Sequence, residues 1–361
     1  MKFQTVRDLL SEKELEAIQA APLISTGRFP TWYPIFSSDR RPVDYLSNEA
    51  VARICSEGDV GWLGLLAPRL CRMDDPEEAS AALAELRTYG AFLEAGFKVR
   101  PIPVKDDSTP DFEVDAGDGP VIVEVFAKHQ DESEITLWEE IEAGKTPEGV
   151  ERRSAKVNGG EIRTVISERR PGGAPDPAKP NDSVQANLIS RMCGAKGKED
   201  QFPSDGPSLL WIDLRSFGAW PEAVKLEQCV PLVSGHHGLT SGALWYAFYG
   251  WKDAPIFEED FPLHERVVKM GHNGRFRLEG KKKSKLSGVI LALPEGLVLL
   301  ENPWANHALP DQARRFAERL PWFNLGHSVC NWSPGDAETL AETGRRQIEA
   351  MKTWRETLDP P

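Results

Sequence analysis

The sequence predicts an α/β fold in which a mixed central β-sheet is flanked by helices. Three observations support this prediction. Residues 76–95 carry apolar side chains at helical spacing. Residues 121–127 are almost continuously apolar, as in a central strand that is covered on both faces, and residues 208–215 repeat that pattern. We expect residues 1–75 to form an N-terminal helical layer, residues 76–215 the core, and residues 216–361 a C-terminal extension.

The composition is that of a soluble globular protein. The chain has 361 residues, of which 40% are hydrophobic and 27% charged, enough for one large domain or two. The sequence contains no run of about 18 apolar residues, so we expect no membrane span. The five cysteines are scattered and lack the Cys-x-x-Cys spacing of a zinc site. The N-terminus is acidic and amphipathic rather than a signal peptide, so we expect a cytoplasmic protein.

The N-terminal layer begins with a recognisable helix start. Ser11 and Glu14 have the spacing of a capping box. Residues 60–70 are strongly apolar and predict a buried helix. The core then opens with the helix at 76–95, for which Asp75 is a natural N-cap and Gly96 a natural end. Glu85 lies on the flank of the apolar stripe of this helix. A carboxylate there marks either the edge of the buried face or a functional position.

Three strands follow the helix. Residues 98–104, 111–115 and 121–127 have strand patterns, and Gly117-Asp118-Gly119 predicts a tight turn between the last two. This hairpin places Asp111 opposite Glu124 or one position away. Because side chains alternate across a strand, Glu124 and Lys128 share a face. Burying these groups unpaired would cost several kcal/mol. A divalent cation between Asp111 and Glu124 would remove that cost, and Mg²⁺ favours such carboxylates.

The Pro110-Asp111 pair, followed about a dozen residues later by a strand glutamate and preceded by a helix glutamate, resembles the PD-(D/E)xK nuclease superfamily. The resemblance implies a restriction-endonuclease-like core and metal-dependent hydrolysis of phosphodiester bonds, with Mg²⁺ or Mn²⁺ as the cofactor. It implies that Asp111 and Glu124 bind the metal and that Glu85 is an auxiliary acid. It also implies a lysine that assists the attacking water.

The chain departs from the family pattern at the lysine. The position two residues after Glu124 is Phe126, whereas Lys128 lies four residues after it on the same strand face. The family also tolerates a lysine on the following helix, where Lys196 is the alternative to Lys128. The sequence is therefore also consistent with a nuclease-like protein that has lost its catalytic activity.

The rest of the core is completed after an insertion at residues 129–183, within which residues 160–168 read as a strand. A helix is expected at 182–201 and a buried strand at 208–215, which gives the order helix, three strands, helix, strand. In the C-terminal extension, residues 242–250, 286–293 and 296–300 read as strands that continue the sheet at its edge. Residues 311–320 and 336–358 read as helices.

The charge is strongly uneven along the chain. The formal net charge is −13, yet residues 264–288 hold eight basic and two acidic residues, and residues 151–170 hold six basic and three acidic ones. Basic segments on an acidic body suit a protein that meets phosphate at one face. We expect these two segments to be candidate contacts to nucleic acid, with DNA as the expected substrate. A homodimer is left open.

Three readings follow. The first is an active metal-dependent endonuclease in which Asp111, Glu124, Lys128 and Glu85 form the site. The second is a catalytically inactive nuclease-like protein that binds nucleic acid or serves as a scaffold. The third is an unrelated α/β protein in which the hairpin acids are structural.

Overall fold

The computed structural model describes residues 3–22, 28–37, 42–104, 109–127, 150–157, 160–167, 202–215, 225–234, 238–257, 261–262, 267–271, 273–277 and 284–330, with single positions between 333 and 353. Strands β4 (Val150–Val157) and β5 (Gly160–Ser167) are described by their backbone. The predicted helix at 182–201 lies outside the described residues, as do Lys128 and most of the insertion.

The N-terminal segment is helical, as the sequence predicted. Its elements are η1 (Val6–Leu9), α1 (Glu12–Ala20), α2 (Trp32–Phe36), α3 (Pro42–Glu57) and α4 (Val60–Leu70). The expected capping box starts α1, where the Ser11 side chain accepts from the Glu14 N–H. The expectation that α4 is buried is wrong for one side of the helix. Leu63, Leu66 and Leu70 are buried, but Leu65 is 75% exposed because only one face of α4 meets its neighbours.

Helix α5 (Pro76–Ala95) is the longest element described. Its start and end are those predicted: the Asp75 side chain accepts from the Glu78 N–H, and Gly96 ends the helix with a positive φ of 94°. Nearly every residue from Ala79 to Ala95 is buried, because α5 packs between the N-terminal helices and the sheet. Gly90 permits a close approach to α3, where an added Cβ would lie 2.6 Å from the Ala50 Cα.

The central sheet is mixed and has six strands in the order β1-β2-β3-β6-β12-β13. Strands β1 (Lys98–Pro101), β2 (Phe112–Asp115) and β3 (Pro120–Ala127) pair antiparallel. Strand β6 (Ser208–Asp213) runs parallel to β3, and β12 (Gly288–Leu293) runs parallel to β6. Strand β13 (Gly296–Glu301) returns antiparallel beside β12 and forms the edge. The general α/β class and the two C-terminal strands at the sheet edge are thereby confirmed.

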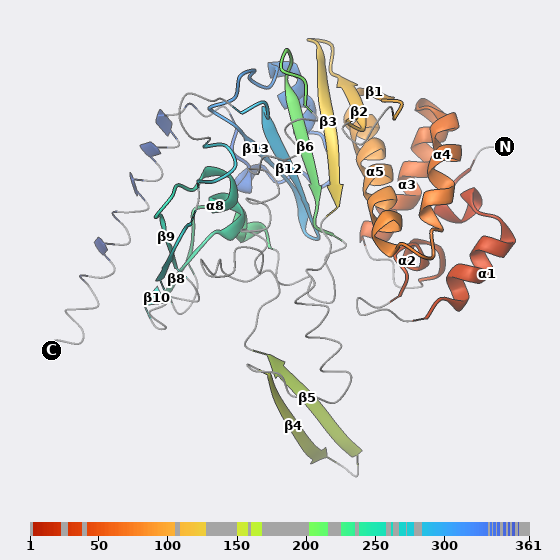
Figure 1. Ribbon diagram of the computed structural model, residues 1–361, viewed down its shortest axis with the longest axis horizontal. Coiled ribbons are helices and arrows are strands. Elements are labelled where there is room, and N and C mark those ends of the chain that lie inside the picture. The colour runs from red at the N-terminus through yellow and green to blue at the C-terminus, as the bar shows by residue number, and fades with distance from the viewer. Residues whose placement is uncertain are drawn as a thin grey trace.

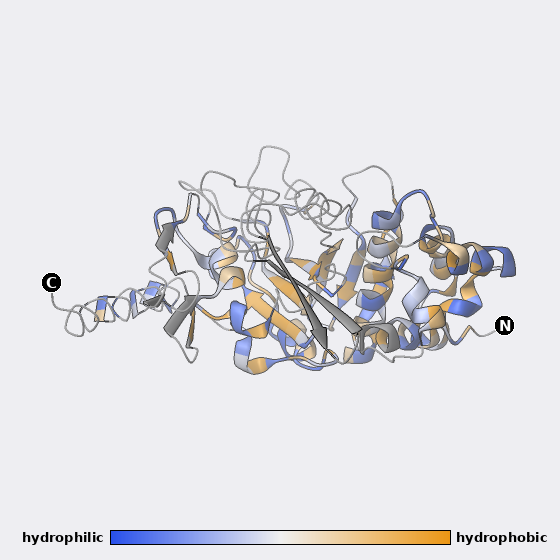
Figure 2. Ribbon diagram, turned by 90° about the horizontal axis from the view of Figure 1, so that it is seen from below, coloured by the Kyte–Doolittle hydropathy of each residue, from blue (hydrophilic) through white to orange (hydrophobic). Residues whose placement is uncertain are grey.

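The sheet separates two apolar cores. Val121, Val123 and Val125 face α5 and the N-terminal helices, together with Trp211 of β6. Leu210 and Ile212 of β6 face the opposite core, which includes α8 (Ala243–Tyr249), and Phe126 packs at its margin. Figure 1 shows the sheet between the N-terminal helices and α8, and Figure 2 shows hydrophobic strands at the centre of the molecule.

The prediction of a strand at 242–250 is wrong, because these residues form helix α8. Every residue from Leu244 to Tyr249 is buried, so the sequence carries no alternation of polar and apolar positions. A short, fully buried apolar run does not distinguish helix from strand by periodicity, and its aromatic residues favour strand by propensity. The choice of helix over strand therefore depends on how residues 243–249 pack against the sheet.

The remaining C-terminal elements surround the sheet. Strands β7 (Leu232–Ser234), β8 (Gly238–Ser241) and β10 (Phe261–Pro262) form a small sheet, and β9 (Pro255–Phe257) pairs with β11 (Val267–Lys269). Short helices are η4 (Leu226–Cys229), α9 (Asp311–Ala317) and η5 (Leu325–His327). In the expected C-terminal helix, the described residues between 335 and 353 are helical. Within the described part of the chain, no helix combines the length and apolar character needed to cross a membrane.

Candidate metal centre

Asp111 lies where the ladder between β2 and β3 ends. Its N–H donates to the Val123 carbonyl at 3.1 Å, and its Oδ2 accepts from the Val125 N–H at 2.7 Å. The carboxylate therefore takes a backbone hydrogen bond at the end of the strand pair, which fixes the orientation of the side chain. Asp111 is half-buried.

Glu124 lies close to Asp111 along the hairpin. The ladder pairs Phe112 with Val123 and ends there, and Asp111 bonds to the backbone of Val123 and Val125, the residues on either side of Glu124. This agrees with the expectation that Asp111 lies opposite Glu124 or one position away. Val123 faces the α5 side, so Glu124 belongs to the other face of β3, with Ile122 and Phe126.

Glu124 is strongly buried for a carboxylate. It is 4% exposed and lies in the middle of β3, where it is paired in register with Leu210 of β6. Phe126, at the position where the family pattern has its lysine, packs at the edge of the apolar core on the α8 side. Lys128 and Lys196 lie outside the described residues, so the assignment of the lysine stays a prediction.

Glu85 lies elsewhere. It sits on α5, which covers the face of the sheet opposite Glu124, and its Oε1 and Oε2 each accept from the Arg69 guanidinium at 2.6 Å. Arg69 of α4 also pairs with Glu78. Burial alone would lower the pKa of Arg69, but its hydrogen bonds and charge interactions with Glu85 and Glu78 outweigh burial and raise it. Glu85 therefore ties α4 to α5.

The described residues include no group of three or more His, Cys, Asp or Glu side chains arranged to hold a metal ion. The predicted set of Asp111, Glu124 and Glu85 is thus not gathered into one cluster. The pair of Asp111 and Glu124 still fits a hard divalent cation, because Mg²⁺ commonly binds one or two carboxylates and takes its other ligands from water and phosphate oxygens.

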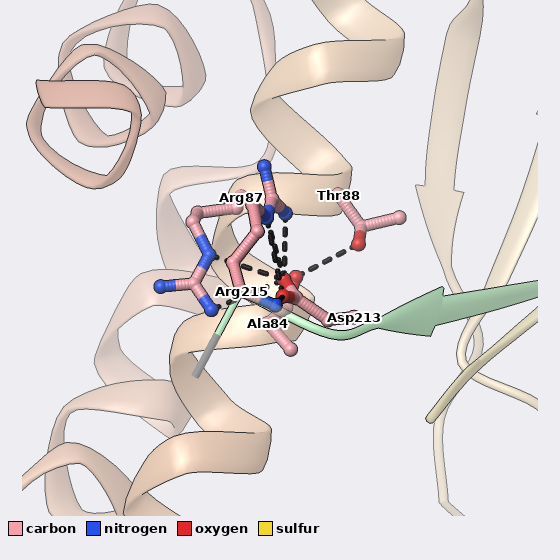
Figure 3. A network of polar contacts seen from close by, with 5 residues as sticks. All are labelled: Ala84, Arg87, Thr88, Asp213 and Arg215. Atoms are coloured by element: carbon pink, nitrogen blue, oxygen red, sulfur yellow. Dashed lines mark hydrogen bonds and ion pairs between the residues drawn. The ribbon is translucent and has the colours of Figure 1, made fainter. Parts of the chain in front are cut away.

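One buried polar network was not foreseen from the sequence. Asp213, the last residue of β6, accepts from Nε and Nη2 of Arg87 at 3.2 and 3.1 Å. It also accepts from Nη2 of Arg215 at 2.6 Å and from the Arg215 backbone N–H at 3.0 Å. Figure 3 shows both guanidinium groups converging on this one carboxylate. Arg87 comes from α5, so the network joins that helix to the sheet.

The network lies at the end of the sheet to which β3 runs. Asp213 pairs in register with Ala127, three residues beyond Glu124, but on the α5 face. Burial raises the pKa of Asp213, and the charges of Arg215 and Arg87 and the hydrogen bonds of Arg215 outweigh burial and hold the pKa well below its usual value. The signal that could have found Asp213 is a charged residue at the end of an otherwise apolar strand, beside Arg215.

Comparison with known proteins found no matching family model, no matching curated protein and no matching solved structure.

Proposed function

We propose that the chain is a metal-dependent nuclease that hydrolyses phosphodiester bonds of DNA, with Asp111 and Glu124 as its metal ligands. The observation that carries the proposal is that Asp111, at the end of the β2–β3 ladder, bonds to the backbone of Val123 and Val125, the residues on either side of Glu124. Glu124 is 4% exposed, and two carboxylates this close along one hairpin are ligands of the kind that Mg²⁺ commonly binds.

The strand order supports the same proposal. A helix precedes three antiparallel strands, and the next strand in the sheet, β6, runs parallel to the third. This is the order that the resemblance to the PD-(D/E)xK superfamily leads us to expect, and the helix that the sequence predicts between β3 and β6 falls outside the described residues. We infer a restriction-endonuclease-like core on this ground.

The residues of the chain would act by holding and orienting. Asp111, fixed by the Val125 N–H, and Glu124, fixed within β3, would hold Mg²⁺ or Mn²⁺ between them. The bound ion would lower the pKa of a water molecule and stabilise charge on the attacked phosphate. Glu85 is left out of the proposed site because Arg69 engages both of its oxygens. Lys128 and Lys196 stay the candidates for the assisting lysine.

The alternative is a nuclease-like protein without catalytic activity that binds nucleic acid. Phe126 favours this alternative, because an aromatic ring that packs against the apolar core replaces the lysine of the family pattern. Such a ring has no proton or positive charge to offer a phosphate, so Lys128 or Lys196 would have to supply it.

Plasmid cleavage with Mg²⁺, Mn²⁺ or EDTA tests the proposal. We expect wild-type protein to cut in either metal and not in EDTA, and Asp111→Asn or Glu124→Gln to lose at least a hundredfold in rate. Glu113→Gln is the matched control, because Glu113 is a carboxylate two residues along the chain from Asp111 and pairs with exposed Arg100 at 2.6 Å. It should cut at the wild-type rate.

Equal cleavage by the wild type, Asp111→Asn and Glu124→Gln would disprove the assignment of the ligands. If no protein cuts while wild type binds DNA, the non-catalytic alternative holds. Lys128→Ala and Lys196→Ala, measured in the same assay, identify which lysine takes part.

A further inference from the structure

The insertion between β3 and β6 contains a two-stranded antiparallel ribbon. Strands β4 and β5 pair over their full length, from Val150 opposite Ser167 to Val157 opposite Gly160. Among the described strands, β4 and β5 pair only with each other. Figure 1 shows the ribbon apart from the six-stranded sheet, on the side to which the arrows of β3 and β6 point. Asp111, which precedes β2, lies toward this end of the antiparallel β2–β3 pair.

The two faces of the ribbon differ in composition. Because opposed residues share a face and neighbours alternate, the register separates the ribbon into two sets. One face holds the basic positions Arg152, Lys156 and Arg163, with the acidic position Glu161 and Val150, Ser154, Val165 and Ser167. The other face holds Glu151, Arg153, Ala155, Val157, Gly160, Ile162, Thr164 and Ile166. The first face has a formal net charge of +2, and the second has a formal net charge of zero because Glu151 and Arg153 cancel.

This division has a physical consequence. A hairpin alone is marginally stable in water, so a ribbon of this kind needs a surface for its apolar face. That apolar face is made by the positions of Ala155, Val157, Ile162 and Ile166. The basic face is then the one that can bind a polyanion. A duplex is the polyanion whose shape fits, because the major groove of B-DNA, about 12 Å wide, admits a two-stranded β-ribbon. Eight residues of strand span about 27 Å.

We propose that the basic face of the β4–β5 ribbon contacts the phosphate backbone of a DNA duplex, with Arg152 and Arg163 as the principal contacts. The inference rests on the proposed function only in taking DNA as the substrate. The sequence led us to expect that residues 151–170 contact nucleic acid, and the inference limits that contact to one face of the ribbon. Arg153, which lies on the other face, should make no contact with the duplex.

Binding of a fluorescent DNA duplex in EDTA, measured by anisotropy over a series of salt concentrations, tests the inference. Arg152→Gln and Arg163→Gln should each weaken binding. Each should also make the fall of log K with log salt shallower by about 0.9, the value for one phosphate contact. The double variant should reduce the ratio of affinities at 50 and 200 mM salt by about tenfold. Arg153→Gln, an equal change of charge one residue away on the opposite face, should bind as the wild type does.

The outcomes separate the ribbon from the metal centre. Equal losses in Arg152→Gln and Arg153→Gln would overturn the assignment to one face, and unchanged binding in the double variant would overturn the ribbon contact. A loss seen with single-stranded RNA but not with duplex DNA would overturn the choice of partner. Because EDTA removes the metal, Asp111→Asn should bind duplex normally in this assay even if it fails to cut. A failure of the nuclease proposal would therefore leave the binding result intact.

Discussion

Replacing Asp213 by asparagine should be among the most destabilising single changes in the sheet. Asp213 is fully buried and accepts from the guanidinium groups of both Arg87 and Arg215, each of which is at most 4% exposed. Asparagine keeps the shape but removes the charge, so both ion pairs to this position are lost. Breaking a buried ion pair by removing one partner costs about 3–5 kcal/mol, which corresponds to a fall in Tm on the order of 10 °C.

Urea denaturation followed by tryptophan fluorescence measures the effect, and two variants calibrate it. Arg215→Gln should cost less than Asp213→Asn, because Arg87 still pairs with Asp213. Asp74→Asn, which removes a carboxylate that is 82% exposed, should stay within about 0.5 kcal/mol of wild type. A loss of less than about 1 kcal/mol in Asp213→Asn would refute the reasoning that the network needs its anion.

The pH dependence of the same measurement has a definite sign. The pKa of folded Asp213 lies below its usual value because of Arg215 and Arg87. Its contribution is therefore fully present above the unfolded pKa of about 3.9 and is lost as the pH falls toward the folded pKa. The stability difference between wild type and Asp213→Asn should be constant from pH 7 to pH 5 and should narrow below about pH 4. A difference that narrows already between pH 7 and pH 5 would point to another titrating group.

Three further changes probe other contacts. Glu85→Gln should lower the free energy of unfolding by about 1–3 kcal/mol, because the charged hydrogen bonds to Arg69 are lost. It should leave the proposed metal-dependent cleavage unchanged at temperatures where the protein is folded. A loss of cleavage without a loss of stability would show that Glu85 belongs to the site. Gly90→Ala should cost about 1–3 kcal/mol in thermal unfolding, because its Cβ would overlap Ala50 of α3, whereas Gly64→Ala, with open space around it, should not destabilise. Burial and Glu14 raise the pKa of Cys71 to about 11, so at pH 8 only about 0.1% of it is thiolate, and peptide mapping after brief iodoacetamide treatment should find it unmodified in folded protein and modified in urea.

The elements that the sequence predicted well are those whose signals are local. The N-cap at Asp75, the terminal Gly96 and the turn at Gly117–Gly119 involve neighbouring residues, and each appears in the structure as expected. The hairpin length predicted Asp111 opposite Glu124 or one position away, and Asp111 bonds to the backbone of the residues on either side of Glu124. These predictions needed no knowledge of what packs against the elements.

The predictions that failed depend on packing. Helix α8 looks like a strand because it is buried on all sides, and α4 looks like a buried helix although Leu65 faces outward. The β4–β5 ribbon was only half foreseen: residues 160–168 read as a strand, while its partner was missed. Its signal was present in Asn158-Gly159, a pair typical of two-residue hairpin turns, between two runs that pair in the structure.

Glu85 illustrates why a site is harder to predict than a fold. Its place on the flank of an amphipathic helix is equally consistent with a metal ligand and with an ion pair, because helical periodicity tells which side of α5 is buried but not which element covers the flank. The covering element is α4, which carries Arg69. Asp111 and Glu124 differ in this respect, since one hairpin contains both residues and its length limits how far apart they can lie. On α5, Glu85 and Arg87 bind partners that hold the helix to α4 and to β6. On this account the hairpin carries the proposed metal ligands and α5 supports the sheet from behind it, so substitutions in α5 should act on stability and substitutions in the hairpin acids on the proposed cleavage.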